Sequence, residues 1–331
     1  MSAGTVAGTT GGRSLRRVVP RTEPWCLPDS RRVLQLSLAA LWLFDAVLQL
    51  QPFMFTPGFG SEMIAPFARG NPASVASAIT WSAGEMSRHA TLAGVAFAGA
   101  QLLIAVGIAW RPTVRIALGL SVAWSLGVWW IGEGLGNLLT GTASPLTGAP
   151  GAVLLYALLA ILLWPAPPGG HADFVAARPL GAIPARLIWL LLWSGLAVLS
   201  VSSFNRQPDG ISGVIRSMTA GQPTWLAALD RSIAQDLAGR GGGVAIATAV
   251  LFGLIAVAVF MPRSIRRASL ILACVAAVAI WVVGEGFGGV FSGPATDPNS
   301  GPLLILLAAA YWPLRPRRTD LSAASAVEMR G

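Results

Sequence analysis

The stretch WWIGEGLG at residues 129–136 closes a long apolar run with one acid between glycines, and WVVGEGFG at 281–288 repeats that arrangement 152 positions later. Other positions agree at nearly the same spacing. In particular, a Trp-Pro pair follows each stretch, at 164–165 and again at 312–313. The sequence therefore predicts that one structural unit occurs twice in tandem.

The composition is typical of a polytopic membrane protein. Of the 331 residues, 54% are hydrophobic and only 11% are charged, whereas about a quarter are charged in a soluble domain. The net charge of +9 comes from arginines that lie between the apolar segments and form no single patch, so we expect no nucleic-acid partner. All basic residues are Arg, and Ala and Gly are abundant, which is typical of a GC-rich bacterial genome.

The apolar segments are long enough, or nearly so, to cross a hydrocarbon core of ~30 Å. If every segment crosses, the arginine-rich connections lie on one side, which the positive-inside rule assigns to the cytoplasm. We therefore predict an all-α integral protein of the bacterial plasma membrane with both termini in the cytoplasm. The eight predicted transmembrane helices lie near 33–52, 91–110, 114–133, 149–164, 184–203, 243–261, 266–284 and 298–314.

These segments divide into two four-helix membrane repeats, 33–165 and 184–314, joined by a cytoplasmic linker at 166–183. Basic cytoplasmic tails precede and follow them at 1–32 and 315–331. Because four crossings is an even number, both repeats should enter the membrane in the same sense, as in transporters built from parallel repeats. The outer loop after the first helix of each repeat has about 40 residues and should contain short interfacial helices.

Two interpretations of the twin acids stay open. In one, each acid ends a helix near the outer surface and reaches water, while the glycines let the chain turn. In the other, the Gly-rich loops 132–149 and 284–301 dip below the surface, since the helices that follow are too short to span the bilayer. The acids then line an outward-facing pocket between the repeats. The candidate binding residues are Glu133, Glu285, Trp129, Trp281, Gly132, Gly134, Gly284 and Gly286.

Asp45 is a third acid, in the first apolar segment and a little outside its middle. An acid at that depth costs several kcal/mol unless it is paired, so it is a candidate for binding and for gating by protonation. The alternative is a structural hydrogen bond to Gln49, Gln51 or a neighbouring helix. The corresponding segment 189–199 holds no acid, so Asp45 is particular to the first repeat.

Metal and cofactor signals are weak. Met86 and His89 in the first outer loop are the candidate metal ligands, because soft thioethers suit Cu(I), but surface methionines more often make apolar contacts. Trp129 and Trp281 could stack on a quinone, although tryptophans at helix ends usually anchor the interface. No phosphate-binding loop, zinc-protease motif or nucleophile elbow is present, so we expect a protein that binds or transports a small solute or cation rather than an enzyme.

The strings LFDAVLQLQPFMFTPGF (43–59) and AGAQLLIAVGIAWRPTVRIALGLSVAWSLG (98–127) join apolar helices through an arginine turn. On these strings the chain resembles the DoxX/DoxD group of four-helix membrane proteins, here in tandem, and GEGLGNLLTG at 132–141 is similar to actinobacterial membrane proteins. The resemblance implies an alternative function, a quinone-linked redox or respiratory accessory subunit with a redox partner protein. The Gly-Glu-Gly acid is not part of that group's pattern, and its paired cysteines are absent. A third alternative is a non-catalytic membrane scaffold.

Overall fold

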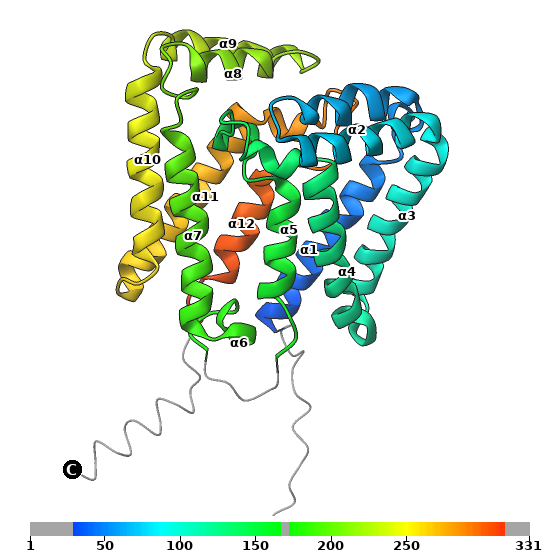
Figure 1. The fold of residues 1–331 in the computed structure, drawn as a ribbon. Helices are drawn as coiled ribbons and strands as arrows, with labels where there is room; N and C mark the ends of the chain where they lie inside the picture. Colours follow the sequence, from blue (N-terminus) through cyan, green and yellow to red (C-terminus); the bar gives the residue numbers. More distant parts are fainter. Residues whose placement is uncertain (1–28, 167–171, 315–331) are drawn as a thin grey trace, which may run out of the picture.

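The computed structural model describes residues 29–166 and 172–314, so the two predicted tails lie wholly or largely outside the described residues. Every described element is helical, and a helix occupies each of the eight predicted apolar ranges (Figure 1). In the first half these helices are α1 (Ser30–Leu48), α3 (Ala90–Ala109), α4 (Val114–Ile131) and α5 (Ala152–Leu162). In the second half they are α7 (Ala182–Ser200), α10 (Gly241–Ala258), α11 (Arg263–Ala279) and α12 (Ser300–Ala310).

Within the described residues, five helices are long and apolar enough to cross a membrane. Their mean hydropathy over the best window is between 1.5 and 2.2, and about a third or less of each window is buried inside the protein. Such an apolar outer surface is what a lipid environment requires. Helix α1 has 19 residues but carries three charged side chains, and α5 and α12 have only 11 residues each. The prediction of eight crossings is therefore supported for five, and the other three stay a prediction.

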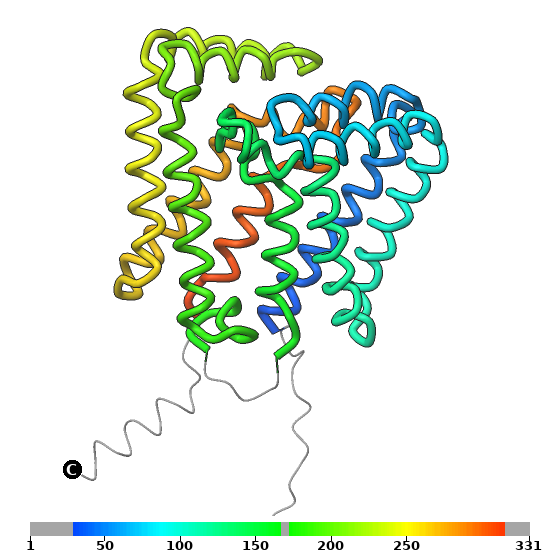
Figure 2. The backbone as a smooth tube through the Cα atoms, in the orientation of Figure 1, coloured from blue at the N-terminus to red at the C-terminus, as the bar shows by residue number. Residues whose placement is uncertain are grey.

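The helices form two neighbouring groups, and α5 and α12 meet between them (Figure 2). In the first group α1 packs on α3 and α4 on α5, whereas in the second α7 packs on α10 and α11 on α12. One apolar core runs through both groups, with large buried rings at its centre. Trp42 lies 4.4 Å from Tyr156, and Trp189 lies 4.8 Å from Tyr311, between ring centroids. The core therefore joins the two groups into one body.

Short helices occupy both outer loops, as predicted. The first loop contains η1 (Pro52–Phe55), η2 (Phe59–Ile64), η3 (Ala65–Ala68) and α2 (Ala73–Arg88). These elements enclose an apolar core of their own, to which Met54, Ile79 and Met86 contribute, and we call them the cap. The second loop contains α8 (Gly210–Ser217) and α9 (Thr224–Leu237), which lie across the upper ends of α7 and α10 in Figure 1.

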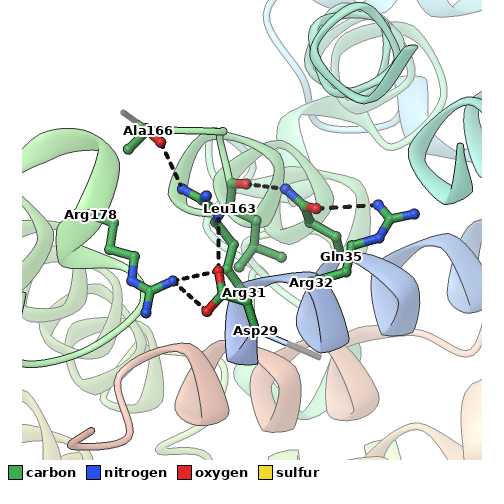
Figure 3. Close-up of polar contacts among 7 residues, drawn as sticks. All are labelled: Asp29, Arg31, Arg32, Gln35, Leu163, Ala166 and Arg178. Atoms are coloured by element: carbon green, nitrogen blue, oxygen red, sulfur yellow. Dashed lines mark hydrogen bonds and ion pairs between the residues drawn. The ribbon is translucent and has the colours of Figure 1, made fainter. Parts of the chain in front are cut away.

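Polar contacts tie the lower end of α1 to the ends of its neighbours (Figure 3). Arg178 Nη1 donates to both carboxylate oxygens of Asp29, at 2.7 and 2.8 Å. Gln35 Nε2 donates to the Leu163 carbonyl at 2.9 Å, and Arg32 donates to the Gln35 amide oxygen at 3.3 Å. The bond from Gln35 occupies a carbonyl at the end of α5, so the lower ends of α1 and α5 are held together.

The segment predicted as a linker is packed into the base of the second group where it is described. Phe174 is fully buried and stacks on Tyr311, with 5.2 Å between ring centroids and 21° between ring planes. The Ala176 amide donates to the Ala310 carbonyl at 2.9 Å. The short helix α6 (Ala177–Leu180) follows. This segment thus holds the C-terminal end of α12 in place.

Candidate functional site

The two Gly-Glu-Gly segments adopt the same backbone conformation. At the end of α4 the Glu133 amide donates to the Val128 carbonyl at 3.0 Å, and the Gly136 amide donates back to the Glu133 carbonyl at 3.0 Å. Leu135 and Gly136 then take left-handed φ values of 56° and 63°. A bond that spans five residues widens the last helical turn. A run of four left-handed residues, 134–137 here and 286–289 in the second segment, then reverses the chain. The segment therefore turns toward the start of α5.

The second segment repeats these features after the π-helical turn η7 (Ile280–Gly284). Its Glu285 amide donates to the Ile280 carbonyl at 2.9 Å, and the Gly288 amide donates to the Glu285 carbonyl at 2.8 Å. Phe287 and Gly288 are left-handed, with φ of 58° and 70°. The tryptophans also correspond, because each indole N–H donates to the carbonyl of a proline ahead of the next helix. The distances are 2.7 Å from Trp129 and 2.8 Å from Trp281.

Each glutamate side chain lies at the N-terminus of the following helix, where backbone N–H groups lack partners. The Glu285 carboxylate accepts the Ser300 and Gly301 amides, at 3.3 and 3.2 Å, and also the Ser300 hydroxyl. Glu133 lies against the first residues of α5, where the Val153 amide stabilises its charged form. Glu285 therefore caps α12, and Glu133 occupies the corresponding place at the start of α5.

Their surroundings differ. Glu285 is buried and bonded through both carboxylate oxygens. In Glu133, the Oε2 atom is shielded from solvent and has no hydrogen-bond partner among the described residues.

Glu285 should make the stability of the protein depend on pH. Burial raises its pKa from 4.5 to about 7, against the lowering effect of the Ser300 and Gly301 donors. The folded state then holds a proton that the unfolded state releases, so this contribution is complete below about pH 4.5 and is lost as the pH rises to about 7. We expect the wild-type protein to lose about 3 kcal/mol across that window relative to Glu285→Gln.

The measurement is the melting temperature in detergent at several pH values, for the wild type and for Glu285→Gln. Other buried acids are common to both proteins, so the difference between the two curves isolates Glu285. Parallel curves across the whole pH range would show that Glu285 does not titrate there.

A cavity of about 270 Å³ lies between the upper half of the first helix group and the cap. Faces of α1, α3 and α4 line it, together with the loops that precede α5 and α12. Three acids, Asp45, Glu133 and Asp297, are among its lining residues. Among the described residues, none of the three makes an ion pair.

Asp45 is 1% exposed, and its Oδ1 atom has no hydrogen-bond partner among the described residues. The hydroxyl of Tyr156 on α5 lies beside its carboxyl group. The bond to Gln49 that the sequence allowed is not formed, because the Gln49 side-chain nitrogen also lacks a partner. Gln51 instead donates to the Ala295 carbonyl at 3.0 Å, which ties the end of α1 to the loop before α12.

Asp297 is the acid that sequence reasoning missed. Its Oδ1 atom accepts the Asn299 amide at 2.7 Å, and Oδ2 accepts the Thr296 hydroxyl at 2.8 Å. Burial raises the pKa of Asp297 above its usual value, and these two donors lower it in part. The only available signal was its position in the Gly- and Pro-rich loop 284–301. The first loop has no acid at the corresponding place, so the repeat does not mark it.

The structure thus separates the predicted site residues into two groups. Those that line the cavity are Asp45, Gly132 and Glu133, together with Met86 from the predicted metal pair. Those that do not line it are Glu285, Trp129, Trp281, Gly134, Gly284 and Gly286, which build the two turns and helix starts. His89 lies at the surface, with Nε2 3.8 Å from Glu85. Within residues 29–166 and 172–314, no three His, Cys, Asp or Glu side chains group as metal ligands do.

No family model matches the chain, and no curated protein or solved structure is significantly similar to it. No family is identified, so the resemblance to the DoxX/DoxD group stays a prediction.

Proposed function

We propose that the chain is a multi-pass membrane protein of two tandem four-helix units, and that its acidic cavity binds a small cationic solute from the outer side. The observation that carries the proposal is the set of three carboxyl groups on one cavity with no ion pair among the described residues. A carboxylate removed from water is costly unless a proton or a cation neutralises it. A bound cation relieves this cost and is therefore favoured.

The tandem organisation is supported by local geometry. The packing of α1 on α3 and of α4 on α5 has a counterpart in α7 on α10 and α11 on α12. The two Gly-Glu-Gly turns share their backbone bonds, their left-handed residues and their indole hydrogen bonds. Matched, interrupted segments in two halves are typical of transporters that bind a solute near the repeat interface.

The proposed topology of eight crossings must explain the short helices α5 and α12, which are only ~16 Å long. Part of the loop before each helix is enclosed by protein, as the buried Ser144 and Ala295 indicate, whereas Leu139 and Phe291 are about half exposed. Non-helical backbone is tolerated at membrane depth when protein encloses it, so the enclosed part of each loop can extend the crossing that the short helix begins. Arginines at the lower ends of the helices, such as Arg115 and Arg267, favour a cytoplasmic base and an outward cavity.

One observation favours the quinone-linked alternative. An apolar groove of about 600 Å³ runs between α5 and α7, lined by side chains such as Leu158 and Leu191. It could hold an isoprenoid tail. However, Ser194 is the only side chain with a polar group among its lining residues, and a quinone headgroup needs donors. The acidic cavity is therefore the better-supported site.

The test is a titration of the detergent-purified protein with the chlorides of sodium, potassium, magnesium and ethylammonium at equal ionic strength. Trp42 and Trp124 line the cavity, so their fluorescence reports on its occupancy. We expect at least one cation to give a saturable change that the other salts do not give. The Glu133→Gln substitution should weaken its binding about tenfold, since it removes one charge-assisted contact.

The matched control is Glu285→Gln, which neutralises the corresponding acid outside the cavity and should leave the binding constant unchanged. Identical responses to all four salts, or equal effects of the two substitutions, would overturn the proposal. A silent pair of substitutions is what the scaffold alternative predicts.

A further inference from the structure

The cavity has an acidic part and an aromatic wall. The aromatic wall consists of three rings that lie side by side: Phe59 from the cap, Phe97 on α3 and Trp124 on α4. Their rings meet edge to face, with centroids 6.0 Å apart for Phe59 and Phe97 and 5.1 Å apart for Phe97 and Trp124. Such a wall offers dispersion contacts to an apolar body and attracts a cation through its ring faces. An inorganic ion alone would leave this wall without a partner.

Three residues that line the polar part of the cavity each carry an oxygen without a hydrogen-bond partner among the described residues. Asp45 Oδ1, Gln101 Oε1 and Glu133 Oε2 are all shielded from solvent and lack a hydrogen-bond partner among the described residues. All three residues line the cavity, and Asp45 and Gln101 are 1% and 7% exposed. Buried polar atoms are nearly always hydrogen-bonded, so a set of three on one cavity indicates a ligand with several donors.

A primary ammonium group has this chemistry. It carries one positive charge and three N–H donors, as the lysine side chain does. Gln49 lies one helical turn beyond Asp45, and its side-chain amide nitrogen has no partner among the described residues. This nitrogen can donate to the Asp45 carboxylate beside a bound ammonium group. Asp297 is bonded to its own loop and contributes its charge rather than a free acceptor.

Metal coordination fits these groups less well. Within the part of the chain that the structure describes, no three His, Cys, Asp or Glu side chains group as metal ligands do. Magnesium and calcium need six or more oxygens around one point, and neutral apolar walls supply none. The cavity therefore favours a monovalent organic cation over a divalent metal ion.

Resting on the proposed function, we infer that the solute is a primary organic ammonium compound with an aromatic or similarly flat apolar body. Its ammonium group lies on the polar side of the cavity, which Asp45, Gln101 and Glu133 line, and its body lies against Phe97 and Trp124.

The experiment measures binding of four probes to the full chain in detergent by tryptophan fluorescence and by isothermal titration calorimetry. The probes are 2-phenylethylammonium, its neutral counterpart 2-phenylethanol, ethylammonium and sodium. We expect 2-phenylethylammonium to bind at least tenfold more tightly than each of the others. Asp45→Asn should weaken its binding at least tenfold, and Trp124→Leu should weaken it more than it weakens ethylammonium binding.

The control substitution is Glu285→Gln, which should leave all four binding constants unchanged. Size-exclusion profiles identical to that of the wild type show that each variant is folded. If ethylammonium or sodium bound as tightly as 2-phenylethylammonium, or more tightly, the inference of an aromatic ammonium solute would be wrong. The proposal that the cavity binds a cation would remain. Equal binding of 2-phenylethanol, or no binding of any probe, would overturn both.

Discussion

Replacing Gly136 by alanine is expected to destabilise the protein by more than about 3 kcal/mol, because two independent costs add. Gly136 has a φ of 63°, where an L-residue with a side chain is strained by about 1 kcal/mol or more. A Cβ atom there would also overlap the carbonyl oxygen of Pro150. Since that carbonyl accepts the Trp129 indole, the overlap would break the bond that leads into α5.

The corresponding residue of the second segment provides a repeat of the same experiment. Gly288 has a φ of 70°, and a Cβ atom would lie 2.5 Å from the Pro298 carbonyl carbon. Gly288→Ala should therefore be similarly damaging. The matched control is Gly127→Ala in α4, where nothing lies within 4 Å of the added carbon and alanine has the better helix propensity.

The measurement is the free energy of unfolding by denaturant in detergent, supported by the melting temperature. We expect the two turn variants to fall well below the wild type, and Gly127→Ala to equal or slightly exceed it. If Gly136→Ala had the same free energy of unfolding as the wild type, the left-handed conformation of Gly136 would be wrong.

Phe174→Ala should cost about 3–5 kcal/mol, the usual loss when a buried phenylalanine is truncated. The ring is fully buried against Tyr311, and the guanidinium carbons of Arg186 and Arg266 lie 5.8 and 5.7 Å from its centroid. Truncation therefore leaves a cavity and removes the aromatic partner of two arginines. One of them, Arg266, is itself buried.

The control is Phe260→Ala at the end of α10, where the side chain is 46% exposed and the same substitution removes no core contact. Phe174→Leu should recover part of the loss, because it refills most of the volume without restoring the stacking. The measurement is the free energy of unfolding of the three variants. We expect the largest loss for Phe174→Ala, a smaller loss for Phe174→Leu and the smallest for Phe260→Ala. An equal effect of Phe174→Ala and Phe260→Ala would show that the segment before α6 does not stabilise the base.

The positions of the main helices could be predicted from sequence because apolar length alone indicates them. Every predicted apolar range contains a helix, and α5 and α12 are as short as the helices that the sequence placed after the two Gly-rich loops. The Gly-Glu-Gly spacing also marked two turns with the same conformation. What it could not show is that Glu285 is bonded through both carboxylate oxygens, while Glu133 lines the cavity and has an oxygen without a partner among the described residues.

The sequence by itself determined the helical class, the positions of the apolar helices and the identity of two of the three cavity acids, since these depend on composition and local spacing. Only the tertiary structure placed Asp297, Gln101 and the aromatic wall beside Asp45, and only it buried Phe174 in the base. These residues come from elements that are distant along the chain. Their contacts depend on how helices pack against one another, and no local pattern of residues encodes that packing.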